Sequence, residues 1–227
     1  SAPPSVLLPD GRPATGRYEG HIARLDWEGL AQARQRPFWW RTLRHKRWQY
    51  LGIGSPQLFI GLAIVDLGWG CTAFAYLFDR SSRRLLADWS QDGIKGWSGR
   101  VSHAPLLGSC AHFRGPSARL SWRHDAPTES LGVHVQVAGL SLEATVSLID
   151  APPVLLAVGP IGEGDSGLAH ATQKTSALPV QGWAQAGGQR FDRAGAFRYP
   201  EGPRRGGARR GGQGVAPRHA AGDRKGS

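Results

Sequence analysis

The chain contains no methionine and only two cysteines, Cys71 and Cys110, in 227 residues. Two cysteines fit a cytoplasmic protein, in which we expect two buried thiols, with one disulfide as the alternative. None of the eight histidines stands at H-x-x-x-H or paired-Cys spacing, the arrangements that commonly hold zinc. We therefore predict no metal site.

Long apolar runs are also missing. No stretch reaches the roughly 18 consecutive apolar residues that a membrane-spanning helix needs. The first residues, Ser1–Ser5, show no basic segment followed by an apolar block. We therefore expect no membrane span, no signal peptide and a cytoplasmic location.

Negative charge is scarce, because 28 Lys and Arg stand against 17 Asp and Glu, a formal net charge of +11. Much of the excess lies in residues 198–227, which hold eight basic and two acidic side chains and so carry +6. Gly, Arg and Ala dominate residues 196–227 without an apolar period, which predicts a disordered basic tail. Within it, Arg204–Gly212 resembles RGG segments, so nucleic-acid binding through salt-dependent phosphate contacts is one functional alternative.

Alternation of apolar and polar residues dominates the middle of the chain and predicts strands. We expect them at 46–53, 58–65, 71–78, 117–123, 133–137, 140–148, 154–158 and 180–186. The parity resets between 137 and 140, which predicts a tight turn or bulge at Ala138-Gly139. Leu58–Val65 is apolar throughout, so we expect burial on both faces. So many strands with little helix predict an all-β fold, an antiparallel sheet or partial barrel.

The chain divides into three parts on these patterns. Residues 1–39 are expected to form an extended N-terminal segment with a short helix at Asp26–Arg36, ended by Pro37. Residues 40–195 form the β domain, and residues 196–227 form the tail.

Two motifs overlap at residues 162–167, and neither predicts a site. Gly162–Gly167 matches the dinucleotide-binding pattern G-x-G-x-x-G, but Glu163 and Asp165 would place negative charge beside the pyrophosphate. We therefore predict no cofactor. The last four of these residues, Gly-Asp-Ser-Gly, match the nucleophile loop of trypsin-like proteases without the other elements of that family.

Several motifs occur in the order found in the domain-of-unknown-function family 2804, and the chain resembles that family over roughly residues 7–195. The matching segments are Leu43–Tyr50, Ile64–Trp69, Phe74–Asp79, Ala171–Lys174 and Leu178–Gly182. His170 stands where the family pattern has Asn.

The resemblance implies a calycin-like fold of two consecutive β-barrel halves, distantly similar to carotenoid hydratases and tocopherol cyclase. Those relatives bind isoprenoids in an apolar β cavity, although no activity is established for the family itself. The family pattern continues after about residue 195, where this chain turns to Arg, Gly and Ala. We therefore expect a chain truncated after its first half, which would self-associate through an exposed sheet edge.

The first functional hypothesis is that the β domain binds an apolar, lipid- or isoprenoid-like small molecule. The candidate cavity residues are Trp48, Tyr50, Trp69, Tyr76 and Lys174. For the aromatic residues, ordinary core packing is the alternative that we favour.

The second hypothesis is a hydratase- or cyclase-type enzyme. Protonating a C=C bond needs a carboxylic acid kept neutral by burial, and Asp66 and Asp79 are the candidates. The alternative is that both are turn residues that accept backbone N–H groups, which is the explanation that we favour.

Overall fold

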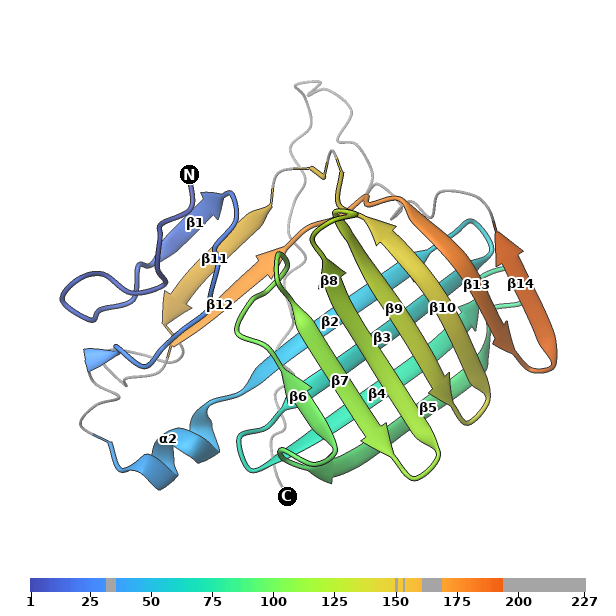
Figure 1. Cartoon of the computed structure of the whole chain (residues 1–227), viewed down its shortest axis with the longest axis horizontal. Helices are drawn as coiled ribbons and strands as arrows, with labels where there is room; N and C mark the ends of the chain where they lie inside the picture. The colour runs from blue at the N-terminus through green and yellow to red at the C-terminus, as the bar shows by residue number, and fades with distance from the viewer. Residues whose placement is uncertain (32–35, 150, 153, 161–168, 194–227) are drawn as a thin grey trace, which may run out of the picture.

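The structure is a computed structural model that describes residues 1–31, 36–149, 151–152, 154–160 and 169–193. It is an all-β molecule built from antiparallel sheets, as the alternation predicted (Figure 1). Its strands are β1 (Gly16–Glu19), β2 (Arg47–Gly54), β3 (Leu58–Asp66), β4 (Gly70–Asp79), β5 (Arg84–Ile94), β6 (Gly99–Val101), β7 (Cys110–Gly115), β8 (Ala118–Asp125), β9 (Ser130–Val137), β10 (Leu140–Ser147), β11 (Leu155–Pro160), β12 (Ala169–Lys174), β13 (Val180–Ala186) and β14 (Gln189–Arg193).

Two of the sheets pack face to face. The four-stranded sheet has the order β2-β3-β4-β5, and the seven-stranded sheet has the order β14-β13-β10-β9-β8-β7-β6. Figure 1 shows the seven-stranded sheet in front, with its strands crossing those of the other sheet steeply, as in orthogonal sheet packing. Both sheets keep open edges within the described residues, so the fold is an open sandwich and no barrel closes there.

Aliphatic and aromatic side chains at alternating positions fill the space between the two sheets. Leu62 of β3 is fully buried, and Leu120 and Trp122 of β8 reach the same core from the facing sheet. Trp89 of β5 meets Phe113 of β7 edge-on, with ring centroids 5.9 Å apart. Each such side chain contributes about 1.5–3 kcal/mol through burial, so this core is the main source of stability.

The strand β3 is almost completely buried, as its apolar sequence predicted. All of its residues are buried except Phe59 and Val65, which are half-buried on the outer face. Burial of Leu58–Val65 is therefore confirmed for the inner face and nearly complete on the outer one.

The predicted turn between β9 and β10 is confirmed. Val137 pairs with Leu140, which leaves Ala138 and Gly139 as a two-residue connection. Gly139 has φ +79°, a conformation that favours glycine.

The third sheet has the order β1-β11-β12 and lies beside the sandwich (Figure 1). It has a small core of its own, in which Val6, Ile22, Leu156 and Val158 are buried. The chain passes from β12 of this sheet to β13 of the seven-stranded sheet through residues 175–179. This connection holds the third sheet against one side of the sandwich.

The helix α2 (Phe38–Arg44) comes directly before β2. The prediction of a helix at Asp26–Arg36 is wrong for residues 26–30, which are not helical, whereas Ala31 is helical and residues 32–35 lie outside the described ranges. Pro37 is the N-cap of α2, so it begins this helix. Proline is tolerated at this point because the first N–H groups of a helix have no partner within it.

The predictions for residues 162–167 and for the tail fall on residues that the structure does not describe. Both cysteines are free, with Cys71 buried and Cys110 half-buried. Within the described part of the chain, no helix combines the length and the apolar character needed to cross a membrane.

Gly68 sets how closely α2 approaches the four-stranded sheet. It lies in the β3–β4 turn with φ +89°. A Cβ atom there would collide with the backbone oxygens of Thr42 and His45 at the end of α2. The helix can therefore rest on this turn because residue 68 has no side chain.

We expect Gly68→Ala to destabilise the fold much more than Gly139→Ala. Both changes place alanine at a positive φ, which costs about 1–2 kcal/mol. The space beside Gly139 is open, whereas alanine at Gly68 must also displace α2 and should cost more than about 3 kcal/mol in total. Urea unfolding of both variants measures the difference, and equal losses would show that α2 does not rest on this turn.

Candidate functional site

A cavity of about 1560 Å³ runs along the open edge of β2. β2 forms one wall along its whole length. The other walls come from α2, from residues 101–109, and from β12 with the segment that follows it to Val180. The cavity therefore lies where the sandwich, the helix and the third sheet meet.

Gln49, in the middle of β2, forms hydrogen bonds with β8 and with the segment 101–109. Its Oε1 accepts a hydrogen bond from Trp122 Nε1 at 2.7 Å, and its Nε2 donates to the Ala104 carbonyl at 3.0 Å. Ser102 Oγ donates to the same carbonyl and accepts the Cys110 N–H, both at 3.0 Å. Because these polar groups satisfy one another, they form a fixed floor for the cavity.

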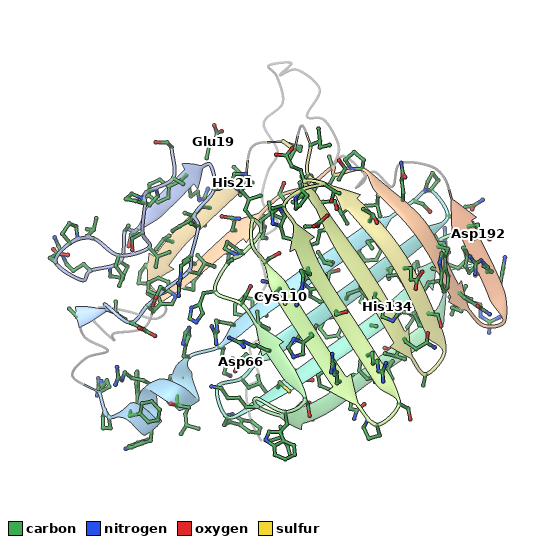
Figure 2. The ribbon with its side chains drawn as sticks, in the orientation of Figure 1. Glu19, His21, Asp66, Cys110, His134 and Asp192 are labelled. Carbon is green, nitrogen blue, oxygen red and sulfur yellow. The ribbon has the colours of Figure 1, made fainter. Side chains whose placement is uncertain are left out.

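Asp66 organises one end of the cavity (Figure 2). It is 7% exposed, and its Oδ2 accepts a hydrogen bond from Arg47 Nη2 at 3.0 Å. Its Oδ1 accepts the Gly68 N–H at 2.9 Å and lies 3.9 Å from Lys95 Nζ. Lys95 Nζ also donates to the Gly68 carbonyl at 2.7 Å. We call this the charged end, and it consists of His45, Lys46, Arg47, Asp66 and Lys95.

The pKa of His45 reflects the burial and the charges of the charged end. Burial lowers the pKa of His45, and the neighbouring Arg47, His103 and Lys95 lower it further, against the opposite effect of Asp66. The neutral ring is therefore favoured. This end of the cavity disfavours an additional positive charge.

Aliphatic side chains line the other end. Leu131, Val146 and Val180 lie opposite one another on β9, β10 and β13, and Leu51 and Ile53 belong to the neighbouring part of β2. We call these five residues the apolar end. From Arg47 to Ile53 the strand extends about 20 Å at roughly 3.3 Å per residue, so polarity changes along the length of the cavity.

One buried hydroxyl in the cavity wall has no partner. Thr175 Oγ1 forms no hydrogen bond within the described part of the chain. Leaving a buried hydroxyl unpaired costs about 1–3 kcal/mol, which a polar group of a ligand would recover.

Most of the aromatic candidates from the sequence lie on the outer face of the four-stranded sheet. The hydroxyls of Tyr50 and Tyr76 are 3.4 Å apart there, and Phe74 stacks on Tyr76 with ring centroids at 6.3 Å. Trp48 is 54% exposed on β2, and Trp69 is 66% exposed in the β3–β4 turn. Core packing, the favoured alternative, is therefore wrong for Trp48, Tyr50 and Trp69. Trp48 and Tyr50 are among the residues that line the cavity, whereas Trp69 and Tyr76 are not.

Lys174 and the two candidate acids occupy three separate places. Lys174 ends β12 and lines the cavity. Asp66 and Asp79 end the antiparallel strands β3 and β4, so they lie at opposite ends of the hairpin and only Asp66 lines the cavity. Hydrogen bonds from Ser82 Oγ at 2.6 Å and from the Ser81 N–H at 2.8 Å lower the pKa of Asp79. Both acids accept backbone N–H groups, as expected of turn residues.

A second hollow, of about 650 Å³, lies on the outer face of the seven-stranded sheet. Figure 2 shows this face toward the viewer, with His134 and Cys110 on it. His134 Nδ1 lies 3.5 Å from Glu143 Oε1 on the neighbouring strand. The hollow is polar and shallow, so it encloses a ligand less than the cavity along β2. In the described ranges no three His, Cys, Asp or Glu side chains gather as they would around a metal ion.

The sequence interpretation missed several residues that build the cavity. Gln49 had a detectable signal, because it alternates with Trp48 and Tyr50 and so places an amide on the opposite face of β2. His45 and Lys95 lie just outside the strands, where alternation says nothing about their direction. Their meeting at Asp66 depends on how α2, β3 and β5 pack together.

We expect Asp66→Asn to destabilise the fold more than Asp79→Asn. The amide retains an acceptor for the Gly68 N–H but removes the charge that Arg47 and Lys95 face, which should cost about 1–3 kcal/mol. Asp79 faces no basic side chain in an ion pair within the described residues, and asparagine keeps an acceptor for the Ser81 N–H, so its replacement should change the free energy of unfolding less. Urea unfolding compares the two variants, and a larger loss for Asp79→Asn would contradict the central role of Asp66.

Comparison with known proteins adds one relationship. No curated protein and no solved structure matches the chain. The sequence profile of the family described as "Domain of unknown function (DUF2804)" matches residues 1–198. That match includes every strand described above, and the chain belongs to the DUF2804 family.

Proposed function

We propose that the protein binds an apolar, lipid- or isoprenoid-like small molecule in the cavity along β2. The observation that carries the proposal is a volume of about 1560 Å³ with an aliphatic end, directly beside a packed core. Protein interiors leave few voids larger than a water molecule. Pockets that bind small molecules are mostly apolar, with a few polar groups that fix orientation.

The walls of the cavity support a preformed site. The hydrogen bonds of Gln49 hold β2 at a set distance from Trp122 and from residues 101–109. A site that is already ordered loses less conformational entropy when the ligand binds. The resemblance to calycin-like, isoprenoid-binding proteins points to the same class of ligand.

The enzymatic alternative would assign proton transfer to Asp66, because this acid lines the cavity. A hydratase or cyclase needs its acid in apolar surroundings. Asp66 instead accepts a hydrogen bond from Arg47 and lies near Lys95. This geometry is typical of an ion pair that orders a turn, so binding without chemistry is the better-supported function.

The two remaining partner hypotheses concern other parts of the molecule. Nucleic-acid binding depends on residues 196–227, which the structure does not describe. Self-association would use a free sheet edge, and β5 is such an edge of the four-stranded sheet. Both stay predictions.

We expect Leu51→Trp to weaken binding of a neutral amphiphile by at least about tenfold, or 1.4 kcal/mol, and Leu86→Trp to leave it unchanged. Both leucines are partly buried at the border of the sandwich core, but Leu51 lines the cavity and Leu86 does not. An indole at Leu51 would occupy the space that the ligand needs. Displacement of the neutral dye Nile red by dodecanol measures binding.

Overpacking should cost each variant about 1–3 kcal/mol, and urea unfolding checks that the two losses are similar. No binding to the wild-type chain, or the same loss of binding in both variants, would contradict the assignment of the cavity.

A further inference from the structure

The cavity carries an excess of positive charge. Of its charged lining residues within the described chain, six are basic and two acidic: Arg41, Arg44, Lys46, Arg47, Lys95, Lys174, Glu28 and Asp66. Arg41 and Arg44 lie in the last turn of α2, where cations complement the free helix carbonyls. Because these two arginines already lie near helix carbonyls, the positive charge is counted at the charged end. That end has three basic residues, Lys46, Arg47 and Lys95, and one acidic residue, Asp66.

The negative charge of Asp66 is already compensated. Arg47 donates to it at 3.0 Å, and the Gly68 N–H occupies its other oxygen. Lys95 Nζ is 3.9 Å from the carboxylate and makes its shorter hydrogen bond, of 2.7 Å, with the Gly68 carbonyl. An ammonium group has three donors, so Lys95 retains the capacity to bind an anion.

The pKa of His45 agrees with an excess of positive charge at this end. Its pKa is lowered by burial first and then by Arg47 and His103. Burial itself disfavours a charge of either sign, so only the smaller contribution of the neighbouring basic groups indicates a positive field at this end.

The charged end and the apolar end are joined by one strand. Gln49 lies between them, and both ends of its amide already have partners in the cavity floor. The amide of Gln49 therefore needs no partner from a ligand, and Lys46, Arg47 and Lys95 place three of the basic lining residues at the charged end.

We propose that the molecule bound in the cavity is an amphiphile with an anionic headgroup, a carboxylate or a phosphate, which lies at the charged end while its chain extends toward the apolar end. This inference rests on the proposed function and adds the chemistry of the headgroup. Lys95 supplies the charge that selects the anion, and Lys46 adds positive charge from an exposed position in the cavity lining. Arg47 acts mainly as the partner of Asp66.

Four probes with the same chain and different headgroups test the selection on the full-length protein. Dodecanoate and dodecyl phosphate are anionic, dodecanol is neutral, and dodecylamine is cationic. Each is titrated below its micellar concentration against bound Nile red. We expect at least one anionic probe to bind about tenfold more tightly than dodecanol, as one charge-assisted hydrogen bond allows, and dodecylamine to bind most weakly.

Variants that remove one positive charge show which residue is responsible for the preference for anionic probes. Lys95→Gln should reduce the ratio of anionic to neutral affinity several-fold. Lys46→Gln should reduce the same ratio by a smaller factor, because Lys46 is exposed. Arg119→Gln is the matched control, because it removes the same charge from an exposed position on the outer face of the seven-stranded sheet and outside the cavity. The ratio should also fall as salt screens the site.

The outcomes separate the two proposals. Equal binding of dodecanol and both anions, or an anionic preference unchanged in both lysine variants, overturns the headgroup assignment and leaves binding of an apolar ligand standing. Absence of binding by all four probes overturns both. A preference for dodecanoate alone identifies the carboxylate as the headgroup, and a preference for dodecyl phosphate alone identifies the phosphate.

Discussion

The steep crossing of the two sheets is the constraint on which the rest of the structure depends. In orthogonal packing the strands of the two sheets cross at near right angles and their inner faces form the core. Here the centre is filled by residues such as Leu62 and Trp122, whereas the edge of β2 is held by the hydrogen bonds of Gln49. The helix and the third sheet line the cavity together with this edge, so the cavity depends on how they pack beside the sandwich.

The charged end serves the fold and the cavity at once. Asp66 fixes the β3–β4 turn through the Gly68 N–H, and the absence of a side chain at Gly68 lets α2 approach. Changes to Asp66 or Gly68 therefore alter the cavity and the stability of the fold together. Lys95 is different, because its side chain is 43% exposed and its contacts within this end go to Asp66 and a backbone carbonyl. It can contribute to ligand selection with little consequence for the fold.

Much of the fold could be predicted from the sequence, because a strand with one buried face must alternate. β5 was not predicted because its burial alternates from Ala87 to Ile94, but its inward positions include Gln91 and Gly93, which are not apolar. β12 escaped because Ala169–Lys174 belongs to a partly exposed sheet and holds few apolar residues. Alternation also placed Trp48 and Tyr50 on one face of β2 without revealing that this face is the outer one. The facing sheet decides that point, and its position is a tertiary property.

The two faces of β2 explain why aromatic residues were a poor guide to the cavity. The outer face carries Tyr50, which meets Phe74 and Tyr76 on β4 across the sheet. The inner face carries Leu51, Ile53 and the amide of Gln49, which are smaller and leave room between the walls. Aromatic rings at these inner positions would fill the space that makes the cavity. A binding site in this fold is therefore marked by aliphatic residues and one bonded amide on the inner face, and the large rings belong to the opposite surface.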